Sequence, residues 1–156
     1  MEHCETIYPS NSSVNGRVFE YLVCETLAQE GIMPFYYQAC FERVPNADFD
    51  VVLYHRHKPV VLTMKTSLRE RYKQADLEGL ALRQVYRKAQ SHLITLSTTE
   101  ADGVKKKISD GDISGLDSCT IATSSEYTEL LQSLSADKFH IAEKVLPIRG
   151  VCVEEV

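Results

Sequence analysis

The chain has 156 residues, of which 44% are hydrophobic and 25% are charged, and its formal net charge is −5. These values are ordinary for one globular domain. The sequence also has no apolar run that approaches the ~20 residues of a membrane-spanning helix, which argues against a membrane span. The acidic balance argues mildly against a nucleic-acid partner, unless basic residues gather locally.

The first predicted element follows a polar arm at residues 1–13. Asn15, Gly16 and Arg17 lead into a helix that runs to about Glu30, and Gly31 ends it. Its apolar side recurs at the three-four spacing of a helix face. The residues of this face are Phe19, Leu22, Val23, Thr26 and Leu27.

Three strands and a long helix come next. We expect the strands at 35–41, 50–54 and 60–65, with the polar turn 55–59 joining the second and third as a hairpin. The helix is predicted over 69–88 and is the longest of the chain. One seam of this helix is apolar: Leu68, Tyr72, Ala75, Leu82 and Tyr86.

The remaining elements alternate between strand and helix. We expect strands at 92–96 and 119–122 and helices at 101–108 and 126–134. In the C-terminal tail, residues 137–156, a short apolar piece either adds an edge strand or docks on a partner. The piece contains Val145, Leu146, Ile148 and Val151. The element order predicts a single α/β domain over residues 1–156, with a mixed central sheet flanked by helices.

The segment from Lys65 to Lys88 is locally basic. It contains seven Lys and Arg against three Asp and Glu, a net charge of +4. A basic stripe on an acidic protein still permits DNA binding, with steep salt dependence. The cysteines are five in number, scattered and without CxxC spacing, and the N-terminus does not have the form of a signal peptide. These features predict reduced thiols in a cytoplasmic protein.

Asp50 and Lys65 form the centre of the candidate chemistry. The acid opens one strand of the hairpin and the lysine closes the other. A carboxylate can hold Mg²⁺ through hard oxygen ligands, and an adjacent ammonium can stabilise charge or orient a water nucleophile. Asp48 lies on the same approach and is the alternative to Asp50.

The commonest arrangement of such a site has an acid two residues before the lysine. Here that position is Thr63, which is neutral and a poor Mg²⁺ ligand. Glu78 on the following helix is the predicted replacement, and Glu20 on the first helix is a further candidate for a supporting contact.

With these residues in view, the chain resembles the PD-(D/E)XK nuclease superfamily. Thr63-Met64-Lys65, then Arg69-Glu70-Arg71 and then Glu78, is similar to the restriction endonucleases of the CCGG group, on the branch of EcoRII, PspGI and SsoII. The resemblance spans roughly residues 16–96. It implies a three-layer restriction-endonuclease-like fold, Asp50 and Glu78 as ligands of Mg²⁺ (or Mn²⁺), Lys65 as catalytic lysine and Glu20 as supporting acid.

The resemblance also implies a target. Arg69, Glu70 and Arg71 would recognise neighbouring C:G pairs in double-stranded DNA, and Lys73 follows on the same basic stretch. An arginine can donate two hydrogen bonds to guanine, and a glutamate can accept one from cytosine, each discriminating by ~1–3 kcal/mol. The expected protein is a homodimeric, sequence-specific Type II restriction endonuclease acting at a site with CC and GG.

Each residue taken alone has an ordinary structural explanation. Asp50 can be a turn residue, Glu78 one half of a helix ion pair, and Glu20 a surface acid. Two other functions also stay open. One is a structure-selective repair nuclease of the same fold, and the other is a non-catalytic DNA-binding module, which Thr63 favours.

Overall fold

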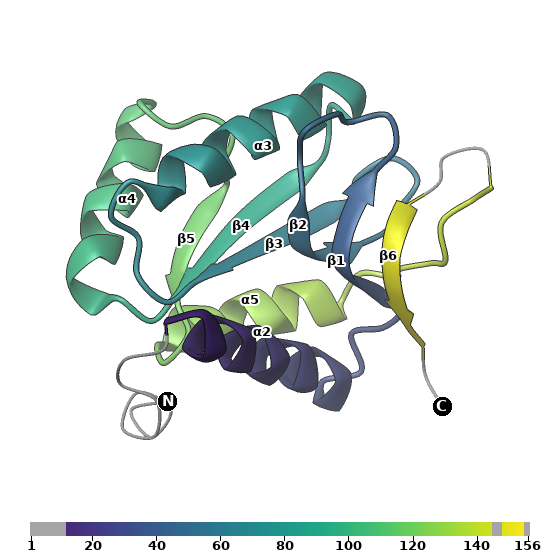
Figure 1. Cartoon of the computed structure of the whole chain (residues 1–156), viewed down its shortest axis with the longest axis horizontal. Helices are drawn as coiled ribbons and strands as arrows, with labels where there is room; N and C mark the ends of the chain where they lie inside the picture. The colour runs from purple at the N-terminus through teal and green to yellow at the C-terminus, as the bar shows by residue number, and fades with distance from the viewer. Residues whose placement is uncertain (1–11, 145–147, 155–156) are drawn as a thin grey trace.

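The computed structural model describes residues 12–144 and 148–154. In these residues a six-stranded mixed sheet lies between two pairs of helices, so the chain has a three-layer α/β fold, as predicted (Figure 1). The strands are Phe35–Phe41 (β1), Phe49–Leu53 (β2), Val60–Lys65 (β3), Gln90–Thr95 (β4), Ser118–Ile121 (β5) and Ile148–Val153 (β6). The helices are Ser12–Gln29 (α2), Arg71–Val85 (α3), Thr98–Asp110 (α4) and Ser125–Ser135 (α5).

The strand order is β5-β4-β3-β2-β1-β6. Strands β1, β2 and β3 pair antiparallel through short connections, whereas β3, β4 and β5 pair parallel. Parallel neighbours need a crossover, and helices α3 and α4 supply the two crossovers here. The carboxyl ends of β3, β4 and β5 therefore lie at the same edge of the sheet, and Lys65 is the last residue of β3.

The two faces of β3 pack against different helices. Val60, Leu62 and Met64 pack with buried residues of α2 and α5. Val61 packs with Leu82 of α3 on the opposite face. Because side chains alternate along a strand, Thr63 and Lys65 share the α3 face with Val61.

The structure corrects several predicted boundaries. Helix α3 begins at Arg71, not at Arg69, because Arg69 has a backbone φ of 38°, which a right-handed helix does not accommodate. Helix α2, with 18 residues against 15 in α3, is the longest described. Ser12 and Ser13 belong to α2, so the predicted N-terminal arm is at least two residues too long. Leu22, predicted in the apolar face, is 39% exposed.

Other predictions are confirmed. Strands β1 and β3 have the predicted bounds, and all five residues predicted along the α3 seam are buried. The C-terminal apolar piece does add an edge strand, β6, which pairs antiparallel with β1. Val145 and Leu146 lie outside the described residues. Four cysteines in the described part of the chain are free thiols, and no helix there is both long and apolar enough to cross a membrane.

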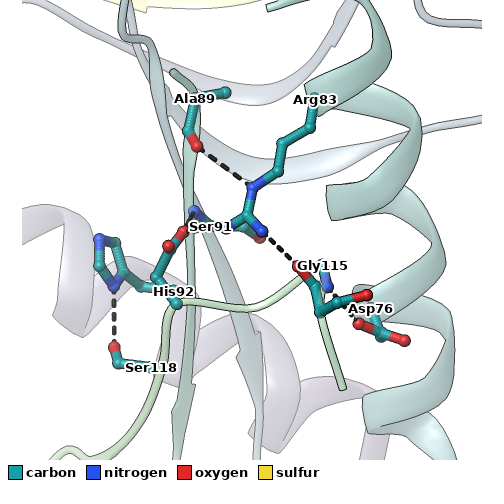
Figure 2. A network of polar contacts seen from close by, with 9 residues as sticks. Asp76, Arg83, Ala89, Ser91, His92, Gly115 and Ser118 are labelled. Atoms are coloured by element: carbon teal, nitrogen blue, oxygen red, sulfur yellow. Dashed lines mark hydrogen bonds and ion pairs between the residues drawn. The ribbon is translucent and has the colours of Figure 1, made fainter. Parts of the chain in front are cut away.

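Helix α3 is fixed to the segment that precedes β5 by a polar network (Figure 2). The Asp76 carboxylate accepts the backbone N–H of Gly115 at 2.6 Å. About two turns later, Arg83 forms an ion pair with Asp117 at 2.6 Å and also donates to the Ser114 carbonyl. Asp117 in turn accepts the N–H of Ser91 in β4, at 2.7 Å. These contacts fix the part of α3 that carries Glu78.

Candidate active site

Asp50 and Lys65 meet across the β2–β3 pair. The Lys65 ammonium lies 3.7 Å from Oδ2 of Asp50, and the same oxygen accepts the backbone N–H of Met64 at 2.6 Å. Their side chains are 14% and 26% exposed, so the pair is partly shielded from water. Asp48, the alternative acid, precedes β2 and is exposed. Of the two acids, Asp50 is therefore the one in contact with Lys65.

Glu78 is buried on the side of α3 that faces the sheet. It is 7% exposed, and its carboxylate accepts a hydrogen bond of 2.8 Å from the Gln74 amide. The charge of Lys65 lowers the pKa of the Glu78 carboxyl, and the charge of Asp50 raises it. The ion pairs with Arg71, Lys73 or Arg83 that would make Glu78 an ordinary surface residue are not among the contacts of the described chain.

The carboxyl groups of Asp50 and Glu78 both have raised pKa values. For Asp50 desolvation by burial is the largest cause, and it outweighs the lowering effects of Lys65 and the Met64 N–H. For Glu78 burial again raises the pKa, against the lowering effects of the Gln74 hydrogen bond and of Lys65. Two desolvated acids beside one ammonium are the kind of perturbed cluster that is enriched at functional sites.

Glu20 approaches from helix α2. Its Oε2 accepts the Tyr37 hydroxyl at 2.8 Å and the Gln38 amide at 2.7 Å, both from β1. Gln38 has a φ of 49°, and the register of β1 against β6 shifts between Tyr37 and Cys40. A bulge of this kind redirects side chains. Here the consequence is that two neighbouring residues of one strand both hold the Glu20 carboxylate.

A cavity of about 490 Å³ opens between the first turns of α2 and the end of β3. Lys65 and Glu20 line it together with Tyr37, Arg17 and Arg71. Three cationic side chains thus surround a space that is wide enough for part of a nucleotide, and the carboxylate of Glu20 faces the same space.

The segment Arg69-Glu70-Arg71 lies on the surface where the chain leaves β3 for α3. All three residues are exposed, as is Lys73, and Arg71 also lines the cavity. Glu70 and Lys73 form an ion pair one helical turn apart, which lowers the pKa of the Glu70 carboxyl. Any contact of Glu70 with a base would compete with this exposed pair.

The backbone of that segment is held from helix α4. Glu100, in the first turn of α4, accepts the N–H of Leu68 at 2.8 Å with one oxygen and the N–H of Arg69 at 3.0 Å with the other. Nothing in the sequence predicted this contact. Its partners are backbone groups more than thirty residues earlier, and a backbone N–H has no residue type that a sequence pattern could reveal.

Tyr37 and Gln38 were also missed. The predicted strand 35–41 gave no reason to single them out, because the bulge that turns both toward Glu20 depends on the pairing of β1 with β6. The C-terminal strand that causes this pairing is more than a hundred residues away in the sequence.

The donor set fits a magnesium ion only in part. Across residues 12–144 and 148–154, no group of three or more His, Cys, Asp or Glu side chains gathers as a metal site. Mg²⁺, however, is commonly bound through one or two carboxylates, with substrate phosphate and water completing its octahedron. Asp50 and Glu78 satisfy that lower requirement, with the remaining ligands to come from the substrate.

No protein-family model matches the chain, and a search of curated proteins finds no match.

Proposed function

We propose that the chain is a Mg²⁺-dependent endonuclease that hydrolyses double-stranded DNA at a specific site containing CC and GG. The observation that carries this proposal is the contact of Asp50 with Lys65 beside a cationic cavity, together with the buried carboxylate of Glu78, on which both charges act. The two acids come from β2 and α3, and their burial has an energetic cost that a purely structural role does not explain.

The roles follow from the chemistry of the groups. Asp50 and Glu78 supply oxygen ligands to a divalent ion, which when bound neutralises charge that develops on the phosphate. The Lys65 ammonium, adjacent to Asp50, orients the attacking water or stabilises the same charge. Glu20 is held rigid by Tyr37 and Gln38 and faces the cavity, where it can accept a hydrogen bond from that water.

Sequence recognition belongs to the exposed segment that follows Lys65. Arg69 and Arg71 can each donate two hydrogen bonds to guanine O6 and N7, and Glu70 can accept from cytosine N4. Because four to six residues separate them from Lys65, recognition and cleavage are coupled within one short stretch of chain. A two-fold dimer would present this stretch to both strands of a near-palindromic site.

The first experiment incubates the purified chain with unmethylated phage DNA and Mg²⁺ and sequences the ends that form. Discrete fragments with one common end sequence are expected. Random ends would instead support a structure-selective nuclease of the same fold, in which the arginines contact only phosphates.

Two ion pairs at opposite ends of β3 supply matched variants. Lys65→Ala and Asp50→Asn should lower the cleavage rate by about 10²–10⁴-fold, the range for loss of a group that acts on the reacting atoms. Lys58→Ala and Asp137→Asn break a pair with a 2.6 Å contact near the start of the strand and should cut like the wild type. Equal loss in both sets would mean that the fold, not the site, was damaged.

A non-catalytic DNA-binding module is the second candidate. Thr63, 3% exposed, occupies the position at which an acid would complete the usual ligand set. A wild-type chain that binds DNA but never cuts it, with either Mg²⁺ or Mn²⁺, would establish the module and reject the nuclease.

A further inference from the structure

The segment between Lys65 and helix α3 has an unusual backbone. Arg69 has a φ of 38°, in the left-handed region that side chains other than glycine seldom adopt. Such a conformation persists only where surrounding contacts enforce it. The N–H groups of Leu68 and Arg69, just before this point, both donate toward one carboxylate and so form a concavity that can hold an anion.

Glu100 fills that concavity. Its two carboxylate oxygens each accept one of the two N–H groups, at 2.8 and 3.0 Å, so the carboxylate holds consecutive residues at once. These hydrogen bonds, with a contribution from Ser97, lower the pKa of the Glu100 carboxyl. The charge also lies in the first turn of α4, where the helix dipole favours an anion.

Helix α4 supports the same region at further points. Lys107 donates to the Tyr72 hydroxyl at 2.8 Å and lies 5.0 Å from the centre of that ring. Leu68, which is fully buried, packs in one cluster with Ala101 and Val104 of α4. In Figure 1 the segment that leaves β3 runs alongside α4 before α3 begins. The side chain of Leu68 thus anchors the segment in the core, while Glu100 sets its backbone.

We infer that Glu100 is a positioning residue for base recognition: by holding the amides of Leu68 and Arg69, it fixes the direction in which Arg69, Glu70 and Arg71 leave the protein. The inference rests on the proposed function, since it concerns the segment that we assign to base contacts. To recognise a base, the two hydrogen-bond donors of one arginine must both reach the edge of the same base pair. If the backbone of the segment moved freely, the arginine could bind several different base sequences. Phosphate contacts have no such requirement.

The test separates discrimination from general binding. Once the wild-type cleavage site is known, wild type and Glu100→Ala are compared on a duplex with that site and on duplexes with one base pair changed. Glu100→Ala should lower the ratio of kcat/KM on the intact site to kcat/KM on a changed site by about tenfold or more, the size of one good base contact. Binding to an unrelated duplex without metal should stay within about twofold of wild type.

Two further variants control for folding. Glu100→Gln keeps one acceptor oxygen, so its ratio should lie between those of wild type and Glu100→Ala. Glu126→Gln alters the matching glutamate in the first turn of α5, which pairs with Lys105 of α4 and does not contact the segment. Its ratio should equal that of the wild type. If Glu100→Ala does not fold, as judged by its thermal transition, the Glu100→Gln ratio decides.

Three results would overturn the inference. A wild-type ratio in a folded Glu100→Ala, or in Glu100→Gln if the alanine variant is unfolded, would show that the carboxylate has no role in recognition. Equal losses on the intact site, on changed sites and in unrelated-duplex binding would show a purely structural role. Wild-type protein that neither binds nor cuts DNA rejects the proposed function and this inference together, whereas the first two results leave the proposed function intact.

Discussion

At the scale of single residues, the site combines charges that the fold would be more stable without. Glu78 is almost completely buried, and a single amide hydrogen bond together with the attraction of Lys65 does not offset its desolvation. Its raised pKa means that the folded protein holds the proton of this acid more tightly than the unfolded chain does. Above that pKa the folded state carries a buried charge that the unfolded chain would hydrate, so this residue reduces stability.

Glu78→Gln should therefore stabilise the metal-free protein while abolishing cleavage. The amide keeps an acceptor for Gln74 and carries no charge. At neutral pH we expect a gain on the order of 1 kcal/mol, or about 2–4 °C in Tm. The gain should shrink as the pH falls through the raised pKa, because wild-type Glu78 then becomes protonated in the folded state, and it should vanish below the ordinary value of 4.5.

Thermal unfolding followed by circular dichroism across this pH range measures the effect. Glu129→Gln, at an exposed position of α5, is the control and should leave Tm unchanged at every pH. A lower Tm for Glu78→Gln at neutral pH would mean that the charge of Glu78 makes a favourable contact in the fold, contrary to the direction of its pKa shift.

At the scale of elements, the docking of α3 determines where Glu78 lies. The residue after it, Gly79, packs directly on the segment before β5. A Cβ added at Gly79 would lie 2.1 Å from the Gly115 carbonyl oxygen, which is far too close for any real contact. Glycine in a helix interior is unfavourable by ~1 kcal/mol relative to alanine. The close approach explains why the helix has it here, with Asp76 and Arg83 fixing the same contact on either side (Figure 2).

Gly79→Ala should therefore lower both stability and cleavage. The helix must move away from Gly115, at a cost of about 1–3 kcal/mol for overpacking, and Glu78 would move with it. Chemical denaturation measures the first effect, and the cleavage rate on a defined site measures the second.

Gly103→Ala in α4 is the matched control. A Cβ there meets nothing within 4 Å, so the alanine should be neutral or should stabilise the protein by up to ~1 kcal/mol, with cleavage unchanged. If Gly79→Ala changes stability and cleavage as little as Gly103→Ala does, α3 does not pack against Gly115 as closely as described above.

At the scale of the whole molecule, charge is unevenly distributed along the chain. The chain carries a net −5, yet the stretch from Lys65 to Lys88 carries +4 and contributes Lys65 and Arg71 to the cavity. One chain has one set of Asp50, Lys65 and Glu78, so cutting two strands within one binding event needs a second copy.

Two chains per duplex are therefore expected at saturation. Light scattering of the complex formed without cleavage, with Ca²⁺ in place of Mg²⁺, should give a protein mass of twice 17.6 kDa on one duplex. A complex saturated by one chain would contradict the dimer, and sequential nicking of the two strands would then be the expected kinetic pattern.

The order of residues alone predicts most of the elements and the α/β class, because hydrophobic periodicity and turn residues are local signals. Strands β1 and β3 and the buried seam of α3 followed from it directly. It also singled out Asp50, Lys65 and Glu78 as candidate site residues, and their roles stay predictions.

The folded structure was needed to show what holds these groups in place. The start of α3 moved by two residues because Glu100 fixes the backbone before it, and Glu20 gained Tyr37 and Gln38 through a bulge that depends on a distant strand. The physical reason is common to both. Contacts to backbone groups, and the register of strands far apart in the chain, are set by the packing of the whole fold, and they leave no local pattern in the residues that make them.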